Sequence, residues 1–496
     1  MTRRKLASLA ALVALLAPAS AAAQADVVSI PAKFPVKNVN GSGVACPADG
    51  DDYELHGEIV GPRAVLEGSA PAAATLYLHV FGYDDFFHFR HAPGVDHATE
   101  MARAGHVSVA LDRLGYDDSP HPPGTATCLG ASADMAKQIV DALRAGSYRP
   151  AEGRARGFQK VVLAGHSVGG EVAELEAYSF GGIDALVLFG VVDSGFQPRA
   201  TQVAVEQGGV CARGGEESGG APGYAFFGQT PESVREFSFY DADPAVVEAS
   251  ERNRHRDPCG DVNSNVPTLT SNNARIREIK VPVLLLYGLN DPVMTSDAQR
   301  QHGPKYSGSS DVTTAYFERT AHAMLLERTA PQVRGTVARW LGDRGLVSEL
   351  PSPRTAAGAP SGCPVRESTV VGSAAADRLK GTAAPDSLFG LGGDDRISSG
   401  RGDDCARGDA GADLLLGAEG ADRLTGGAGA DRISGGGGAD RLDGSSGRDR
   451  LRGGPGADRL TARDGLSDLV DCGSGGGDRA TVDRVDRVVG CERVAR

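Results

Sequence analysis

The stretch Val161-Val162-Leu163-Ala164-Gly165-His166-Ser167-Val168-Gly169-Gly170 decides the fold of the first part of the chain. An apolar run ends at a serine flanked by glycines, and the amphipathic segment Glu171 to Ala177 follows, so the pattern predicts a strand, a sharp turn and a helix. Such a turn holds a serine hydroxyl clear of the backbone, near N–H donors and within reach of a base. Gly165 and Gly169 supply the small residues that the turn needs on either side of Ser167. The sequence therefore predicts that Ser167 is a nucleophile.

Further strand-like runs surround this turn and alternate with helical patterns. Several are apolar throughout, which is typical of parallel strands buried on both faces. The helical segment Ser132 to Arg144 carries Met135, Ile139 and Leu143 on one face, as expected for packing on a sheet. We expect an α/β fold with a mostly parallel sheet built from the runs 53–60, 74–80, 107–111, 161–164, 185–191, 281–287 and 313–317.

Three motifs resemble the α/β-hydrolase superfamily of esterases and lipases: Gly165–Gly170, Asp112–Ser119 and Val281–Pro292. The resemblance covers roughly residues 50–345 and implies a triad in the chain order serine, acid, histidine. By that resemblance Ser167 is the nucleophile, Asp291 the acid and His322 the base. The oxyanion donors would be the N–H of Val168 and that of Phe81 or Val80. His79-Val80 stands where the family usually has His-Gly.

Two of these assignments have rivals in the sequence. Asp193 follows the preceding strand, a position from which some lipases take their acid. His302 is the other histidine near the end of the resemblance that follows Asp291, but it lies too close to Asp291 for another strand to come between them. His166 is expected to be a structural residue of the turn rather than a base.

The long connection from about residue 195 to 280 is predicted to form a lid that governs substrate choice. It contains the aromatic run Tyr224-Ala225-Phe226-Phe227. Together with the aromatic residues near Phe81 and Tyr83, this run could line an apolar acyl pocket or pack in the core.

Beyond residue 370 an aspartate recurs every nine residues, from Asp377 to Asp458, with Leu or Ile two positions after almost every one. This nonapeptide resembles the RTX parallel β-roll, which implies glycine turns, an aliphatic interior and structural Ca²⁺ between the aspartates of stacked turns. A disordered Gly/Asp linker would not keep aliphatic residues in register. The copies between Gly426 and Leu460 match best. The implied ligands are Asp395, Asp413, Asp422, Asp431, Asp440, Asp449 and Asp458, and no cofactor is implied for catalysis.

The remaining segments complete the predicted organisation. Residues 1–25 have a basic start, a short apolar run and small residues, which favours a cleaved signal peptide over an uncleaved membrane anchor. We expect a catalytic domain at 26–348, a Pro-rich linker at 349–368, the β-roll at 369–461 and a cap at 462–496. Eight cysteines in an exported chain favour disulfides, and proximity suggests Cys211 with Cys259 and Cys472 with Cys491.

Charge and motifs together define the expected function. The net charge of −13 argues against nucleic acid as a partner, because it predicts no basic stripe for phosphates. The leading hypothesis is a secreted serine hydrolase acting on small-molecule or lipid esters, without a transmembrane segment after signal cleavage. Thioesterase, amidase and haloperoxidase-like chemistry stay open. The rival hypothesis is a catalytically silent hydrolase fold in a surface or matrix protein attached through its β-roll.

Overall fold

The largest sheet includes strands from the first part of the chain and from its C-terminal repeats. The computed structural model describes residues 26–83, 85–348, 368–372 and 376–496, so the predicted signal peptide and most of the linker lie outside the described residues. Strand pairing gives the first part of the sheet in the order β1, β2, β4, β3, β6, β7, β11, β12, in which the β1–β2 and β2–β4 pairs are antiparallel and the other pairs are parallel. The bounds are β1 Val27–Lys37, β2 Asp52–Pro62, β3 Ala73–Leu78, β4 Ser108–Leu111, β6 Lys160–His166, β7 Ala185–Phe189, β11 Val283–Gly288 and β12 Val312–Phe317. The predicted α/β architecture with a mostly parallel sheet is confirmed.

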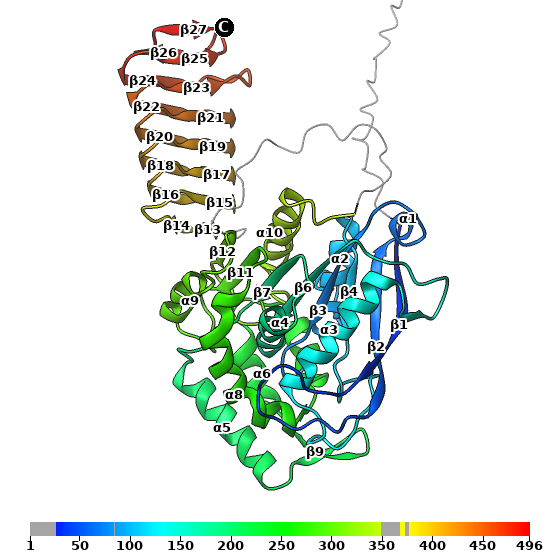
Figure 1. Ribbon diagram of the computed structural model, residues 1–496. Coiled ribbons are helices and arrows are strands. Elements are labelled where there is room, and N and C mark those ends of the chain that lie inside the picture. Colours follow the sequence, from blue (N-terminus) through cyan, green and yellow to red (C-terminus); the bar gives the residue numbers. More distant parts are fainter. Residues whose placement is uncertain (1–25, 84, 349–367, 373–375) are drawn as a thin grey trace, which may run out of the picture.

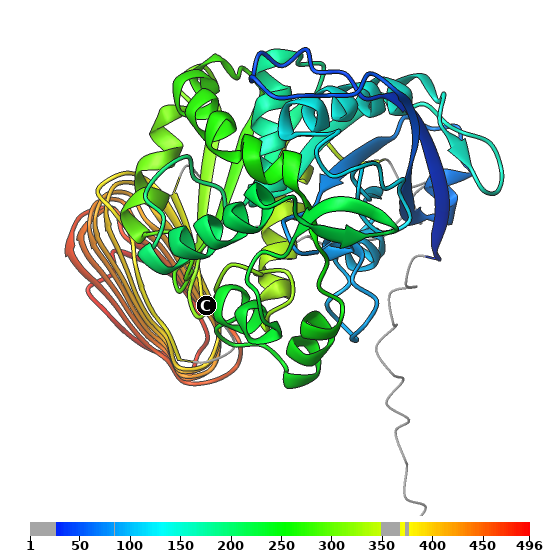
Figure 2. The same ribbon diagram turned by 90° about the horizontal axis from the view of Figure 1, so that it is seen from below.

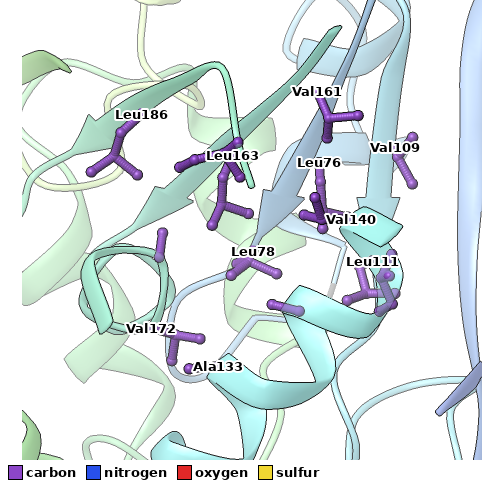
Figure 3. Close-up of a cluster of buried hydrophobic side chains, with 14 of the residues drawn as sticks. Leu76, Leu78, Val109, Leu111, Ala133, Val140, Val161, Leu163, Val172 and Leu186 are labelled. Atoms are coloured by element: carbon purple, nitrogen blue, oxygen red, sulfur yellow. The ribbon is translucent and has the colours of Figure 1, made fainter. Parts of the chain in front are cut away.

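Helices cover this sheet on both faces (Figure 1). They are α2 His97–Arg103, α3 Leu129–Ala145, α4 Val168–Ser179, α9 Ser296–His302 and α10 Ala330–Asp343, with the short α1 Arg63–Leu66 and β5 Arg149–Pro150 at the periphery. Figure 3 shows how one face is sealed: Leu76 and Leu163 of neighbouring strands lie against Val140 of α3 and Val172 of α4. All four are fully buried, and burying such a side chain stabilises the fold by about 1.5–3 kcal/mol.

The connection between β7 and β11 forms a layer of its own over the carboxyl ends of the strands. It comprises α5 Pro198–Ala212, β8 Glu216–Ser218, β9 Ala221–Ala225, α6 Pro231–Ser238, α7 Pro244–Arg252, β10 Asp257–Pro258 and α8 Cys259–Arg275. Strands β8, β9 and β10 make a small antiparallel sheet. The disulfide Cys211–Cys259 ties the end of α5 to the start of α8, which confirms that pairing.

The C-terminal part is a roll of short parallel strands that form two facing sheets. One sheet has β13, β15, β17, β19, β21, β23, β25 and β27, and the other has β14, β16, β18, β20, β22, β24 and β26. Successive turns superimpose in the view of Figure 2, as expected for a repeat whose aspartates and aliphatic residues recur in register. The strands are β13 Ser368–Val371, β14 Arg378–Lys380, β15 Asp386–Gly392, β16 Arg396–Arg401, β17 Cys405–Ala410, β18 Leu414–Glu419, β19 Arg423–Ala428, β20 Arg432–Gly437, β21 Arg441–Ser446, β22 Arg450–Gly456, β23 Arg459–Ala462, β24 Leu469–Gly475, β25 Arg479–Val482, β26 Arg487–Val489 and β27 Arg493–Ala495.

The roll does not end where the nine-residue spacing does. Strands β24 to β27 continue the two sheets through the segment expected to be a separate cap. Asp468 and Asp478 take up the repeat aspartate position there, although one residue has been inserted before each of them. The extra residue is absorbed in the turn, so the strands stay in register. The disulfide Cys472–Cys491, which was also expected, closes this end of the roll, and Cys46–Cys128 is a further bond in the first part of the chain.

The roll continues the central sheet without a break. Edge strand β12 pairs in parallel with β13, with Thr314 opposite Ser368 and Phe317 opposite Val371. Val371 and Phe389 belong to the same buried cluster as Trp340 of α10, and the Arg339 guanidinium lies 5.0 Å from the centre of the Phe389 ring. The first turns of the roll are therefore part of the core of the α/β unit (Figure 1).

Candidate active site

Ser167 lies at the turn between β6 and α4, as the sequence predicts. Its φ of 52° and ψ of −122° lie outside the regions that L-residues readily adopt, so the surrounding backbone must hold it. Backbone segments pack closely around this turn. A Cβ on Gly165 would lie 2.3 Å from the Gly169 carbonyl oxygen, and a Cβ on Gly169 would lie 2.1 Å from the Leu78 carbonyl oxygen. Both glycines are thus required by contact with backbone.

The loops after β11 and β12 bring Asp291 and His322 together. The His322 Nδ1 atom lies 2.8 Å from Asp291 Oδ2, and both residues are buried. Asp291 Oδ1 accepts hydrogen bonds from the N–H groups of Val293 at 2.7 Å and Met294 at 3.3 Å. Because a carboxylate only accepts, Nδ1 carries the hydrogen and Nε2 is left as the basic nitrogen of His322.

His166 supports the His322 loop. Its Nε2 donates to the His322 carbonyl oxygen at 2.8 Å, and its ring stacks on Phe86 with 4.3 Å between ring centres. Burial, followed by the neighbouring His322, lowers the pKa of His166 well below its usual value, so the ring is neutral at pH 7. This residue therefore positions the loop, in line with the structural role expected for it.

The two rival residues lie in other surroundings. Asp193 forms an ion pair with Lys305, and neither lines the cavity that contains Ser167. His302 is buried on α9, where its Nδ1 lies 2.8 Å from the Tyr287 hydroxyl and its Nε2 lies 3.5 Å from Glu174. Asp291 and His322 are thus the carboxylate and the imidazole that the fold brings together, and His322 lines the same cavity as Ser167.

Ser167 and His322 share one cavity of about 410 Å³. This volume lies within the range of roughly 300–1,000 Å³ that is usual for small-molecule sites. Its wall also contains Val168 and Phe81, and within the described residues neither of their backbone N–H groups has a hydrogen-bond partner. The other wall residues are mostly apolar and come from the layer between β7 and β11, among them Ala204, Phe227, Val234, Phe237, Val266 and Leu269. The cavity wall therefore contains Ser167 and His322 and is otherwise mostly apolar. We call the part lined by the layer between β7 and β11 the apolar chamber.

Comparison with known families agrees with this geometry. A sequence model of the alpha/beta hydrolase family matches residues 77–334, which is just over half of the chain. The chain belongs to the alpha/beta hydrolase family. A model of the RTX calcium-binding nonapeptide repeat matches residues 371–404, 407–442 and 434–465. A search of curated proteins gave no match.

Solved structures similar to this alpha/beta hydrolase include three enzymes. A thermophilic esterase from Thermogutta terrifontis is 17% identical, and the match covers 63% of this chain and 99% of that chain with a TM-score of 0.45. A monoacylglycerol lipase from Paleococcus ferrophilus is 19% identical, with 58% and 98% covered and a TM-score of 0.42. An enol-lactonase from Burkholderia xenovorans is 18% identical, with 58% and 97% covered and a TM-score of 0.42.

The aspartates of the RTX repeats stand in two buried rows. In each row the Oδ1 atom of one aspartate accepts the N–H of the aspartate two repeats earlier, as between Asp431 and Asp413 at 2.9 Å. Among the described residues, the Oδ2 atoms of all the predicted ligands except Asp449 are buried without a hydrogen-bond partner, and those of Asp468 and Asp478 are too. The sequence analysis left these last two out because the nine-residue spacing ends at Asp458.

The space around these oxygens suits a calcium ion. A Cβ on Gly426 would lie 2.2 Å from Asp431 Oδ2 and 2.9 Å from the Gly444 carbonyl oxygen, so glycine keeps open a space lined by carboxylate and carbonyl oxygens. Ca²⁺ prefers such oxygen ligands. The described residues contain no group of three His, Cys, Asp or Glu side chains that could hold a metal by themselves.

Two polar features of the hydrolase cavity were not anticipated. Glu171 lies one helical turn after Ser167 in the cavity wall, and its Oε2 accepts from Asn265 Nδ2 at 2.8 Å. Burial and the nearby Glu174 raise the pKa of Glu171 well above its usual value.

Asp257 Oδ1 accepts the Gly82 N–H at 2.9 Å, which anchors the loop that carries Phe81. The four-residue spacing from Ser167 could have identified Glu171, but no local signal identifies Asp257.

We expect Gly169→Ala to destabilise the protein by at least ~3 kcal/mol, because the added carbon meets backbone oxygen at a place where two elements are already in contact. Gly335→Ala in α10 is the matched control, since its Cβ would meet only the Arg339 guanidinium at 3.6 Å. It should stabilise the helix by about 0.5–1 kcal/mol. Thermal unfolding of both variants checks this, and equal melting temperatures would contradict it.

Proposed function

We propose that this alpha/beta hydrolase is a secreted serine hydrolase that cleaves carboxylic esters, with Ser167, His322 and Asp291 as its triad. The observation that carries the proposal is the buried Asp291–His322 hydrogen bond beside a cavity whose wall contains both His322 and Ser167. The strained backbone of Ser167 supports the same role, because strain of this kind is retained where the surrounding structure enforces it and clusters at active sites.

The proposed reaction follows from the chemistry of these groups. His322 Nε2 takes the proton of the Ser167 hydroxyl as its oxygen attacks the ester carbonyl, and Asp291 stabilises the resulting imidazolium. The N–H groups of Val168 and Phe81 stabilise the negative charge that develops on the carbonyl oxygen. The imidazolium then protonates the departing alcohol. Water, activated by the same His322, releases the acid and restores the free Ser167.

The apolar chamber supports aliphatic or aromatic acyl groups as the part of the substrate that is bound. Phe227 and Phe237 lie in its wall, where apolar side chains outnumber the charged ones. Thioesters present the same carbonyl geometry and can be attacked by the same route. The lining thus favours apolar acyl compounds, including lipid esters, over sugars or peptides.

Export is the second part of the proposal. Three disulfides are formed within the described residues, as is typical of oxidising compartments. The RTX repeats would find abundant Ca²⁺ outside the cell. Among the described helices, none has the length and the apolar character needed to cross a bilayer.

Labelling with a fluorophosphonate tests the proposed function directly, because such reagents react covalently with an activated serine. We expect one labelled peptide containing Ser167, together with hydrolysis of a series of p-nitrophenyl esters from acetate to longer acyl chains. A folded, calcium-loaded protein that neither reacts nor hydrolyses any ester would support the rival view of a silent fold used for surface attachment.

The choice between the two candidate acids gives a separate prediction. Asp291→Asn should lower kcat by roughly 10²–10⁴-fold, because the amide no longer fixes the His322 tautomer or stabilises the imidazolium. Asp193→Asn is the matched control and should keep activity within about threefold, since Asp193 pairs with Lys305 outside the cavity. The reverse order of the two losses in steady-state assays would transfer the role of acid to Asp193.

A further inference from the structure

A row of arginines on the outside of the roll has no part in ester hydrolysis. Most strands of the roll begin at the residue after the repeat aspartate, and in one sheet the pairing places arginines at the strand starts directly opposite one another. Neighbouring strands lie about 4.8 Å apart, so the row is straight and closely spaced along the roll. All its members are exposed, and in the first four strands the next residue is buried, because successive side chains of a strand point to opposite faces. We call this row the arginine ladder; it consists of Arg423, Arg441, Arg459, Arg479 and Arg493.

The ladder begins where the contact with the α/β unit ends. In the two preceding strands of the same sheet the equivalent positions are Ser387 and Cys405, which are in register with Arg423. Both are buried, and Cys405 belongs to the same buried cluster as Phe389 and Trp340. This position at the start of the strands is thus occupied by a small residue where the α/β unit covers the sheet face. It is occupied by arginine in each following strand of the sheet, where that face is exposed.

The ladder is not explained by stability. Like charges directly opposite each other on neighbouring strands are destabilising. Within the described residues, none of the five forms an ion pair, whereas Arg401 and Arg407 elsewhere on the roll do. The adjacent row on the same face carries a single carboxylate and is made of Thr425, Asp443, Thr461, Thr481 and Ala495.

The other sheet of the roll differs in this respect. Its equivalent row is interrupted by Leu414 and Leu469, so only Arg432 and Arg450 are neighbours among its central strands. The continuous charge is therefore confined to one face. The expectation from the overall charge of −13 that no basic stripe exists is wrong, because strand register gathers arginines that are two repeats apart in sequence.

We propose that the arginine ladder binds a linear acidic polysaccharide whose carboxylates or sulfates lie along the roll. A single straight row of cations matches a one-dimensional polyanion better than a lipid surface, whose charges spread in two dimensions. Arginine pairs with planar carboxylates through two hydrogen bonds. Nucleic acid is disfavoured because no aromatic residue follows Phe389 in the sequence, so the strands of the ladder offer no aromatic side chain on which bases could stack. Figure 1 shows the roll pointing away from α5 and α8, which leaves the catalytic cavity accessible while the ladder is bound.

Binding to a heparin oligosaccharide by the calcium-loaded full chain tests the proposal. The acidic chain repels polyanions overall, so binding reports a local basic surface. The ladder variant R441Q/R459Q/R479Q should bind on the order of a hundredfold more weakly at about 0.1 M salt, where each neutralised charge contributes up to roughly eightfold. The matched control R396Q/R432Q/R450Q removes the same number of charges from the interrupted face and should change the affinity by less than about threefold.

Three outcomes would overturn the proposal. One is a wild-type protein that does not bind the oligosaccharide, and another is an equal loss in the two triple variants, which would indicate unspecific attraction. The third is tighter binding to single-stranded DNA or to phosphatidylglycerol vesicles than to the oligosaccharide, which would assign the ladder to a different partner. Circular dichroism of the variants in Ca²⁺ confirms that the roll is folded in each comparison.

Discussion

Replacement of Ser167 by alanine should abolish ester hydrolysis, with kcat/KM falling by at least ~10⁴-fold. The change removes one oxygen atom from the tip of a strained turn and leaves Asp291, His322 and the cavity wall in place. A loss of this size corresponds to about 5.5 kcal/mol of transition-state stabilisation, which is the scale expected when the nucleophile itself is lost. Steady-state hydrolysis of p-nitrophenyl esters by both proteins measures it.

The control for this prediction is Ser147→Ala, which makes the same chemical change at an exposed site after α3. Both variants should melt within a few degrees of the wild type, because neither hydroxyl makes a hydrogen bond that stabilises the fold among the described residues. Substantial activity in Ser167→Ala would remove Ser167 from the mechanism. Equal losses in the two variants would point to unfolding instead.

The sequence allowed much of the candidate site to be predicted because each residue of the proposed triad follows a strand. Ser167, Asp291 and His322 come after β6, β11 and β12, and the carboxyl ends of neighbouring parallel strands meet at one edge of a sheet. The roll was predictable for a similar reason, since a nine-residue period fixes both the register and the direction of each side chain.

Features that depend on contacts between distant segments could not be predicted. Nothing near Asp257 indicates that it accepts the Gly82 N–H, because the two residues meet only when the connection between β7 and β11 folds over the sheet. The pairing of β12 with β13 was hidden in the same way, and residues 349–368, which lead into β13, were expected to act as a linker. Net charge also concealed the arginine ladder, since a sum over the chain contains no information on position.

Removal of Ca²⁺ should unfold the roll and weaken the α/β unit as well. Without the ion, the buried Oδ2 atoms of Asp422, Asp431 and Asp440 have no hydrogen-bond partner within the described residues, and neighbouring aspartates of a row repel one another. Each site that is lost withdraws about 2.7 kcal/mol of stabilisation if Ca²⁺ had been present at 100 times its Kd. Because β13 pairs with β12 and Phe389 packs in the core with Trp340, we expect EDTA to lower the melting temperature of both parts. Circular dichroism and calorimetry with EDTA, followed by addition of excess Ca²⁺, measure this.

The variant D431N/D440N/D449N separates ion binding from other effects of EDTA. An amide oxygen can accept the same main-chain hydrogen bond as the Oδ1 atom of each of these aspartates does, but the negative charge is gone. In EDTA this variant should therefore be more stable than the wild type, and Ca²⁺ should stabilise it less. A wild type with the same melting temperature in EDTA and in Ca²⁺ would contradict a structural role for the ion.

Acid should partly replace calcium, because protonation also removes the repulsion within the rows. Burial, and then the neighbouring aspartates, raises the pKa of Asp422 and Asp449 to about 7. Burial, and then the neighbouring Asp413, raises the pKa of Asp431 to about 6. Between the ordinary value of 3.8 and these values the folded roll binds more protons than the unfolded chain, so its stability is greatest near pH 4 and falls as the pH rises towards 7. In EDTA the roll should accordingly melt at a higher temperature at pH 5 than at pH 8. In saturating Ca²⁺ this order should be reversed, because protons then compete with the ion for the same oxygens.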